Sequence, residues 1–494
     1  MAEHNQTKTS APQVKNPNGL GVFALAAIVV SSMLGGGIYS LPQNMAAGAS
    51  AGAVLLAWII TGIGIYFIAK TFSVLSMAKP DLTTGIYSYS RAGFGPYTGF
   101  TIGWSYWLCQ VCGNVGYAVI TMDALNYFFP PHFAGGNNLP SIIGGSLIIW
   151  GFNYLVLKGV KQASIVNLIG TIVKIVPLIL FVLITLFVFH FSKFDFNFWG
   201  EAVATKLKLG SLSTQIKSTM LVTLWAFIGI EGAVVMSNRA KSSSEVGKAT
   251  LLGFVSCLIF YVLLSLLPFG YMTQEQLAAI PNPSTAGILE QIIGKSGAWL
   301  MNIGLLVSVL TSWLAWTMVT AQIPQAAAQD GTFPQTFTTE NSAGSPSVSL
   351  WVTSAAMQVF LLLVYFSNNA WNTMLSITSV MVLPAYFTSC AYLWKICEDG
   401  EYPNNIIVHR SSALFTAIIG SFYALWLIYA AGLKYLMLAV VIIALGIPVY
   451  IWARHEHNPQ ERIFSRGECV FASILVIIAI AAIYGFSRGL ISLN

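Results

Sequence analysis

Runs of about 20 apolar residues, long enough to cross a bilayer as helices, recur along the chain between short polar connections. Thirteen such runs lie at residues 20–42, 50–76, 98–129, 140–160, 164–191, 217–237, 246–271, 290–323, 347–366, 369–395, 410–431, 434–453 and 468–487. They predict an all-α polytopic membrane protein with 12–13 transmembrane helices. The longest connections, 192–216, 272–289 and 324–346, leave no room for a soluble domain. In 324–346 we expect a short interfacial helix or an ordinary loop.

The composition supports this class. Of 494 residues, 56% are apolar and 8% are charged, with a mean hydropathy of +0.73, whereas soluble domains carry about 25% charged residues. Residues 1–18 are polar and resemble no cleavable signal. The six cysteines lie mostly inside apolar runs and indicate no disulfide framework. Cys109 and Cys112 form a C-x-x-C within one span, where we expect packing rather than redox or metal chemistry.

Lysine and arginine predict the orientation, because cytoplasmic loops carry more of them than external loops. With a cytoplasmic N-terminus, the inner segments, including the adjoining span ends, hold fifteen of these residues: Lys8, Lys15, Lys70, Lys79, Arg91, Lys158, Lys161, Arg239, Lys241, Lys248, Lys395, Arg410, Arg454, Arg462 and Arg466. The outer segments hold seven: Lys193, Lys206, Lys208, Lys217, Lys295, Lys434 and Arg488. The remaining one, Lys174, falls well inside a span. We therefore expect the N-terminus inside and, with thirteen helices, the C-terminus outside.

Three consecutive glycines, Gly35, Gly36 and Gly37, lie inside the first span and are followed by Pro42. Each glycine costs a helix about 1 kcal/mol, and lipid tolerates a broken helix only where protein or water lines the gap. Close packing through small residues is the alternative, but packing motifs space their glycines by four. We predict an unwound segment whose free N–H groups bind a substrate carboxylate.

The sixth span carries a second interruption, in which Gly229 and Gly232 flank Glu231 near mid-membrane. A carboxylate at this depth is expensive and is a functional candidate by default, although a structural hydrogen bond to a neighbouring helix would also account for it. Spans one and six occupy corresponding positions in two five-helix halves, and such paired interruptions mark the central site of a transporter. Asp123, the other acidic residue inside a span, is expected at the outer rim.

These motifs resemble a known family. The run from Gly35 to Pro42 is similar to the G-S-G-[IV]-[FY]-x-x-P signature of the amino acid–polyamine–organocation transporters. The run from Trp225 to Glu231 is similar to the W-[SA]-F-x-G-x-E of their basic amino acid/polyamine antiporters. Within that branch the chain most resembles arginine/ornithine and histidine/histamine antiporters. It departs at Gly36, where much of the superfamily has Ser or Thr, so that a side-chain contact to the carboxylate is lost and the backbone with Ser32 or Ser40 must supply it.

The resemblance implies a 5+5 inverted-repeat core with discontinuous helices 1 and 6, and a role for each matching residue. Trp225 would cap or stack on the substrate, and Glu231 would neutralise a cationic side chain that Asn114 also touches. Tyr106 and Trp316 would act as gates, although belt or packing roles are an alternative for both. The substrate-binding set is Ser32, Gly35, Gly36, Gly37, Asn114, Trp225, Ala226, Phe227, Ile228 and Glu231, where the carbonyls of 226–228 would accept from the ammonium.

Lys174 lies inside the fifth span, about ten residues from its cytoplasmic start. It could snorkel to a helix end. In relatives with a lysine at this place, the ammonium takes the position of a sodium ion between helices 1, 5 and 8. The resemblance then implies that Thr311 and Ser312 are the hydroxyl remnants of that ion site, which would make transport independent of sodium.

Together these features predict a secondary antiporter that exchanges a basic amino acid for its metabolic product across the plasma membrane of a bacterium. We expect arginine/ornithine first, with histidine/histamine, lysine/cadaverine or a proton-coupled importer as alternatives. We expect residues 1–18 to form a cytoplasmic tail, 19–395 the transport core and 396–494 peripheral helices. No enzyme activity, cofactor, metal site or nucleic-acid partner is expected; His455-Glu456-His457 is a charged turn. The expected partners are the small-molecule substrate, the lipid bilayer and, where family members dimerise, a second copy of the chain.

Overall fold

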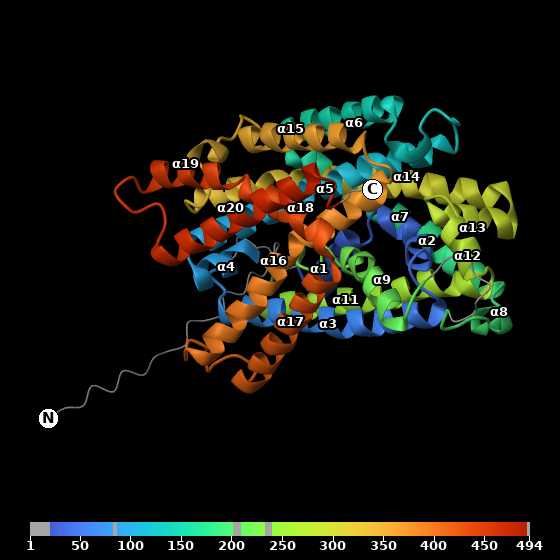
Figure 1. The fold of residues 1–494 in the computed structure, drawn as a ribbon, viewed down its shortest axis with the longest axis horizontal. Coiled ribbons are helices and arrows are strands. Elements are labelled where there is room, and N and C mark those ends of the chain that lie inside the picture. The colour runs from blue at the N-terminus through green and yellow to red at the C-terminus, as the bar shows by residue number, and fades with distance from the viewer. Residues whose placement is uncertain (1–19, 83–85, 201–208, 233–239, 492–494) are drawn as a thin grey trace.

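The computed structural model describes residues 20–82, 86–200, 209–232 and 240–491, with the side chains of 160–173 and 243 left out. Many of the long helices run close to the long axis of the molecule, and others cross it obliquely (Figure 1). The first half of the chain contributes α1 (Val22–Met33), η1 (Gly36–Ser40), α2 (Leu41–Ala46), α3 (Ala51–Ala78), α4 (Ile86–Phe94), α5 (Pro96–Asn126), η2 (Ala134–Gly136), α6 (Leu139–Leu157), α7 (Val160–Phe187), α8 (Phe191–Asp195) and α9 (Leu212–Ala226).

The second half begins after the part of the chain around 233–239 that is not described. It contributes α11 (Ser243–Leu266), η4 (Leu267–Gly270), α12 (Gln274–Ala279), α13 (Ser284–Ile293), α14 (Lys295–Gln329), η5 (Gln335–Thr338), α15 (Ser347–Val364), α16 (Ala370–Glu398), α17 (Arg410–Ala430), α18 (Leu433–Ala444), α19 (Ile447–His457) and α20 (Arg466–Ser487).

The helices confirm the polytopic all-α class. Among the described residues, ten helices are long and apolar enough to cross a membrane, and α1 with the bent continuation Gly36–Ala46 makes an eleventh. The two remaining predicted spans coincide with α7 and with α9 plus the turn that follows it. One predicted end was wrong: α14 continues through Pro324 to Gln329, so the expected interfacial helix is the last turn of a transmembrane helix.

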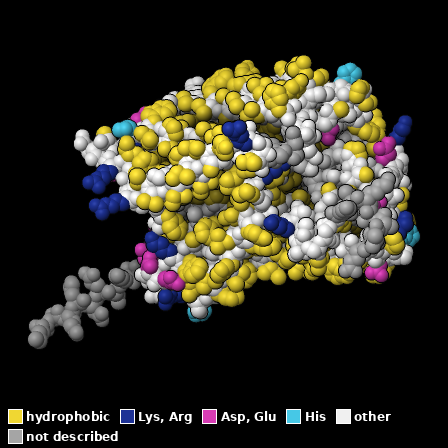
Figure 2. Space-filling view, in the orientation of Figure 1, with side chains coloured by type: hydrophobic (Ala, Val, Ile, Leu, Met, Phe, Trp, Pro, Cys, Tyr) yellow, Lys and Arg dark blue, Asp and Glu magenta, His cyan; other side chains and the backbone are white. Residues whose placement is uncertain are grey.

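Lipid-facing surface and polar ends are separated as a membrane requires. Hydrophobic side chains cover most of the face seen in Figure 2, and charged side chains gather mostly at its two ends. The helices α4 and α19 mark one end and α8, α12 and α13 the other (Figure 1). The three ion pairs between described residues, Lys79–Glu401, Arg91–Asp330 and Arg454–Glu461, all lie in connections that we predict to be cytoplasmic.

The helices α5 and α16 form the centre of the bundle and run antiparallel. Ser105 donates from its hydroxyl to the Met381 carbonyl at 2.7 Å, and the Cys109 thiol donates to the Thr378 carbonyl at 3.2 Å. From Ser105 to Cys109 the residue numbers rise along α5 while those of their partners on α16 fall, so the two helices run in opposite directions. Residues that precede Cys109 and residues that follow Thr378 therefore lie toward the same end, the one carrying α4.

The first span is broken as the glycines predict. The chain bends by 54° between α1 and the segment Gly36–Ala46, and the glycines begin a short 3-10 helix instead of continuing α1. Pro42 adds no second break, because it occupies the first turn of α2, where proline needs no backbone partner. The sixth span is interrupted too: α9 ends at Ala226 and turns occupy residues 227–231.

The predicted orientation can be tested with Cys469. It is the one exposed thiol of the six, and it follows Arg466 in the first turn of α20. A maleimide that cannot cross the membrane should label it in inside-out vesicles and not in intact cells, as read by mass shift. The variant Cys469→Ser should remain unlabelled on both sides. Labelling of the wild type in intact cells would reverse the predicted orientation.

Candidate functional site

The two helix breaks meet at Ser32 and Gly229. The Ser32 hydroxyl lies 2.8 Å from the Gly229 carbonyl and 2.8 Å from the Val29 carbonyl of its own helix, either of which it can donate to. Gly229 adopts a φ of +106°, which is accessible to glycine and strained for other residues. A Cβ there would also approach Ser32 backbone and hydroxyl atoms to 3.0 Å. The break in the sixth span, which follows α9, therefore packs directly on the end of α1.

The glycine triplet provides space for three other helices. A Cβ on Gly35 would lie 2.6 Å from the Tyr117 hydroxyl of α5, and one on Gly36 would lie 2.1 Å from a methyl of Val309 on α14. A Cβ on Gly37 would lie 1.9 Å from the ring of Trp225 on α9. At Gly36, where the superfamily has Ser or Thr, Val309 fills the place of that side chain.

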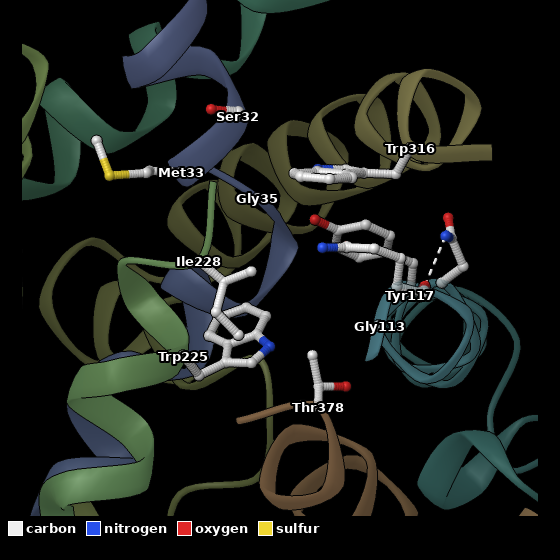
Figure 3. Close-up of a pocket in the computed structure, with 11 residues that line it drawn as sticks. Ser32, Met33, Gly35, Gly113, Tyr117, Trp225, Ile228, Trp316 and Thr378 are labelled. Atoms are coloured by element: carbon white, nitrogen blue, oxygen red, sulfur yellow. Dashed lines mark hydrogen bonds between the residues drawn. The ribbon is translucent and has the colours of Figure 1, made fainter. Parts of the chain in front are cut away.

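A small cavity opens beside these breaks (Figure 3). Trp316 and Tyr117 lie on one side of it. Trp225 at the end of α9 and Ile228 in the turn that follows face them from the other side. The space in the cavity that the centres of water molecules can occupy is about 30 Å³, room for about two water molecules. The lining residues are Ser32, Met33, Gly35, Gln110, Gly113, Asn114, Tyr117, Trp225, Ile228, Trp316 and Thr378.

Polar groups without partners face or border this cavity. Asn114 donates through Nδ2 to the Gln110 carbonyl at 2.8 Å and to the Thr320 hydroxyl at 3.1 Å. Its Oδ1, the Gln110 Nε2 and the Thr378 Oγ1 are buried, and none has a hydrogen-bond partner among the described residues. Buried polar groups are rarely left unpaired, and a site for water or ligand explains such a group. The cavity therefore combines aromatic faces with unsatisfied neutral polar groups.

Glu231 lies outside the cavity lining, within a cluster that we call the clasp: Glu231, Tyr106 and Tyr386. Tyr106 donates its hydroxyl to Glu231 Oε1 at 2.7 Å, and Tyr386 donates to Oε2 at 3.0 Å. The Gly229 N–H donates to Oε2 at 3.2 Å. The carboxylate is 1% exposed. Glu231 thus joins α5 and α16 to the turn that follows α9, on the α4 side of the cavity.

Lys174 on α7 is buried, with 1% of its surface exposed. Its ammonium donates to the Ser31 carbonyl at 2.8 Å, to the Ser31 hydroxyl at 3.0 Å and to the Ser312 hydroxyl at 3.5 Å. The side chain does not snorkel to a helix end in this conformation. Thr311, the other predicted hydroxyl, donates instead to carbonyls of its own helix.

The remaining predicted residues occupy less direct positions. Phe227 packs its ring against Trp58 and Tyr261, and its carbonyl accepts from the Ile230 N–H at 3.1 Å. Ala226 is buried at the end of α9 and does not line the cavity. Asp123 accepts from the Gly135 N–H at 3.1 Å, in the connection between α5 and α6, as expected of a rim residue.

Comparison with known proteins identifies the family. A family model described as amino acid permease matches residues 20–448, most of the chain. The chain belongs to the amino acid permease family. Three curated relatives, each named an arginine/agmatine antiporter, align with the permease over almost its whole length.

The relative from Chlamydia felis (strain Fe/C-56) is 61% identical over 474 residues, which cover 96% of this permease and 98% of the relative. The one from Chlamydia abortus (strain DSM 27085 / S26/3) is 60% identical over the same length with the same coverage. The one from Chlamydia pneumoniae is 60% identical over 482 residues, 97% of the permease and 99% of the relative. These relatives confirm the predicted branch of basic amino acid antiporters.

Several residues of the permease site escaped prediction. Gln110 and Tyr117 share a face of α5 with Asn114, at spacings of four and three residues that place side chains together, so a helical-wheel argument could have found them. Thr378 lines the cavity. Its neighbour Ser379 does not line the cavity, and its hydroxyl lies 3.0 Å from the Leu221 carbonyl.

Two further partners also escaped prediction. Tyr386 completes the clasp on Glu231, and Ser31 holds the Lys174 ammonium. No sequence signal marks Tyr386 among the twenty tyrosines, because its role depends on how α16 is rotated against α5.

The space at Gly37 can be tested by Gly37→Ala. Overpacking of a well-packed interior costs about 1–3 kcal/mol, and the added methyl would displace the Trp225 ring. We expect a lower melting temperature in detergent, measured by differential scanning fluorimetry. The matched control is Gly151→Ala in α6, where a Cβ meets nothing within 4 Å, and which should leave the melting temperature unchanged or raise it. Equal melting temperatures for the two variants would contradict the close approach at Gly37.

Proposed function

We propose that this permease is an antiporter that exchanges arginine for agmatine across a bacterial plasma membrane. The observation that carries the proposal is the cavity at the meeting of the two helix breaks, lined by three aromatic side chains and by neutral polar groups. Its position suits an amino acid, and its lining suits a planar cation. The relatives, about 60% identical over nearly the full length and named arginine/agmatine antiporters, support the same pair.

The amino acid backbone would be held by the helix breaks. The first N–H groups of a helix have no partner within it and attract an anion, so the segment that begins at Gly36 offers a carboxylate site. Ser32 adds a hydroxyl at the same place, whereas Ser40 is buried outside the cavity lining. The carbonyls at the end of α9, beside Ile228, would accept from the ammonium.

The substrate side chain would lie against Trp316 and the polar groups on α5 and α16. A guanidinium over an indole ring gains cation–π attraction, and it donates hydrogen bonds in a fixed planar arrangement. The unpaired Asn114 Oδ1 and Thr378 Oγ1 are acceptors for such donors. Arginine and agmatine share the guanidinium and differ in the carboxylate, so this part of the cavity would recognise both.

The clasp and the aromatic residues would control access. The clasp joins α5 and α16 to the turn after α9 on the α4 side of the cavity, and we propose that it closes this side of the carrier. We propose that Tyr106 and Glu231 release one another when the carrier opens toward the α4 end, which would let Glu231 attract the cationic substrate. Trp316, in the wall of the cavity, would move with the substrate as the second gate.

The rest of the chain would support this core. We propose that residues 19–395 form the inverted-repeat transport unit and that the helices of 396–494 surround it, after a cytoplasmic tail of 1–18. Cross-linking in native membranes would detect a homodimer.

The exchange pair can be tested by counterflow in proteoliposomes. We expect uptake of labelled arginine when agmatine or arginine is loaded inside, and background uptake into empty liposomes. Arginine carries one net positive charge and agmatine two, so arginine/agmatine exchange should respond to a potassium-diffusion potential. Arginine/ornithine exchange, which the sequence resemblance favours, would not respond, because both substrates carry one charge.

The outcomes separate the alternatives. Counterflow restricted to histidine and histamine, or to lysine and cadaverine, would overturn the arginine assignment. Uptake into empty liposomes driven by a proton gradient alone would replace exchange by proton-coupled import. A rate that is the same with and without internal substrate would rule out obligatory antiport.

The buried ammonium can be tested by Lys174→Ala. If Lys174 occupies a cation site between α1, α7 and α14, its removal should leave a polar gap at Ser31 and Ser312 that sodium can enter. We expect exchange to fall and to be restored in part by sodium chloride but not by choline chloride. The control is Lys158→Ala, whose ammonium lies 4.5 Å from the exposed Tyr154 ring at a helix end. Wild-type exchange in Lys174→Ala without sodium would refute the role.

A further inference from the structure

The cavity poses an electrostatic problem. None of its lining residues in the described part of the chain carries a charge, yet the proposed substrates are cations. A cation that leaves water for a buried site needs compensating groups. The buried carboxylate of the clasp could supply them, but it lies outside the cavity and both of its oxygens are bonded to tyrosine hydroxyls. A residue between the carboxylate and the cavity is therefore needed to transmit the electrostatic effect of Glu231 to the substrate.

Gln110 occupies the place between the clasp and the cavity. Tyr106, Gln110 and Asn114 follow one another at intervals of four on α5, so their side chains lie one above the other on one helix face. Tyr106 belongs to the clasp, whereas Gln110 and Asn114 line the cavity. Gln110 is 4% exposed, and its Nε2 is buried without a hydrogen-bond partner among the described residues.

A glutamine suits a position between a carboxylate and a cation because its amide has both an acceptor and a donor end. The Tyr106 hydroxyl hydrogen is committed to Glu231 Oε1, so the hydroxyl oxygen is left as an acceptor on the side of the helix where Gln110 follows. The amide N–H can turn toward this oxygen. Its carbonyl oxygen then points to the cavity, where a cationic substrate brings donors only.

We propose that Gln110 links the substrate to the clasp through a polarised chain of hydrogen bonds. The substrate donates to Gln110 Oε1, Gln110 Nε2 donates to the Tyr106 oxygen, and Tyr106 donates to Glu231. Each bond strengthens the next, because aligned hydrogen bonds polarise one another in a low-dielectric interior. The inference rests on the proposed function, since it requires a cationic substrate in this cavity.

The chain has a consequence for gating. When the cavity is filled, Gln110 is held between the substrate and Tyr106, and its N–H is fixed on the Tyr106 oxygen of the clasp. When the substrate leaves, the amide loses its outer partner and its orientation is no longer fixed. Occupancy of the cavity is thus sensed at the clasp without any charged residue in the cavity wall. Gln110 is a positioning residue for Tyr106 as well as a specificity-determining contact.

The experiment is a double-mutant cycle on the full-length protein, with arginine binding measured by isothermal titration calorimetry. Gln110→Met keeps the size of the side chain and removes both hydrogen-bonding ends. In the wild-type background it should weaken arginine binding about tenfold, the value of one hydrogen bond to a charged group. In the Tyr106→Phe background it should weaken binding by a clearly smaller factor, because the link to the clasp is already cut and only the direct contact with the substrate is left to lose.

Tyr106→Phe alone should also weaken arginine binding several-fold, although Tyr106 does not line the cavity. This variant keeps Gln110, so it tests the link even if Gln110→Met folds poorly. The matched control is Thr121→Val, on the same helix, which removes a buried hydroxyl that also lacks a partner but lies outside the cavity lining. It should bind arginine as the wild type does.

Three outcomes would overturn the link: unchanged binding in Gln110→Met, an equal loss of binding in both backgrounds, or unchanged binding in Tyr106→Phe. An equal loss in both backgrounds would show that Gln110 contacts the substrate without acting through Tyr106. These outcomes are distinct from failure of the proposed function, in which the wild type itself neither binds arginine nor exchanges it for agmatine.

Discussion

A bilayer supplies no water to peptide groups that leave a helix, so each break must be satisfied by the protein itself. Gly229 shows how this is achieved. Its N–H donates to the Glu231 carboxylate, and its carbonyl lies within hydrogen-bonding distance of the Ser32 hydroxyl at the end of α1. Both backbone groups of the residue with the most unusual conformation in the turn therefore have side-chain partners. The break after α9 can exist because α1 ends beside it. The cavity exists because both helices stop there.

The two buried charges support these breaks from opposite sides. The Lys174 ammonium binds the Ser31 carbonyl, one of the carbonyls in the last turn of α1 that have no partner within the helix. A cation is favoured there because the helix dipole leaves negative charge at a C-terminus. Glu231, in contrast, accepts hydrogen bonds from the Gly229 N–H in the turn after α9 and from two tyrosine hydroxyls. Each of the two side chains thus stabilises one interrupted helix, which explains how two ionisable groups can be buried inside the membrane.

The sequence predicted the helices and both breaks because each rests on a local signal. Apolar runs identify membrane-crossing segments, and stacked glycines are incompatible with an ordinary helix. The rotation of the helices has no such signal. α16 is buried on nearly all sides, so no contrast between a polar and an apolar face indicates which side of it turns inward. This is why Thr378 and Tyr386 could not be told apart from their neighbours, whereas Asn114 could be predicted from a motif. Glu231 was predicted as a substrate-binding residue, and in this structure it lies in the clasp, outside the cavity lining.

The separation of the carboxylate from the cavity agrees with what an exchanger must do. It has to bind two substrates and release both, and agmatine carries one positive charge more than arginine. Arginine and agmatine share the guanidinium, so a carboxylate 4 Å from it would strengthen the binding of both, by about 4 kcal/mol at an effective dielectric constant of about 20. That is about a thousandfold in affinity, and it would slow the release of both substrates. With Glu231 held by two tyrosines outside the cavity wall, aromatic faces and neutral amides meet the substrate, and their weaker attraction favours release. The cost of a buried carboxylate is then borne by the clasp, which opens and closes, rather than by the surface that must bind both substrates.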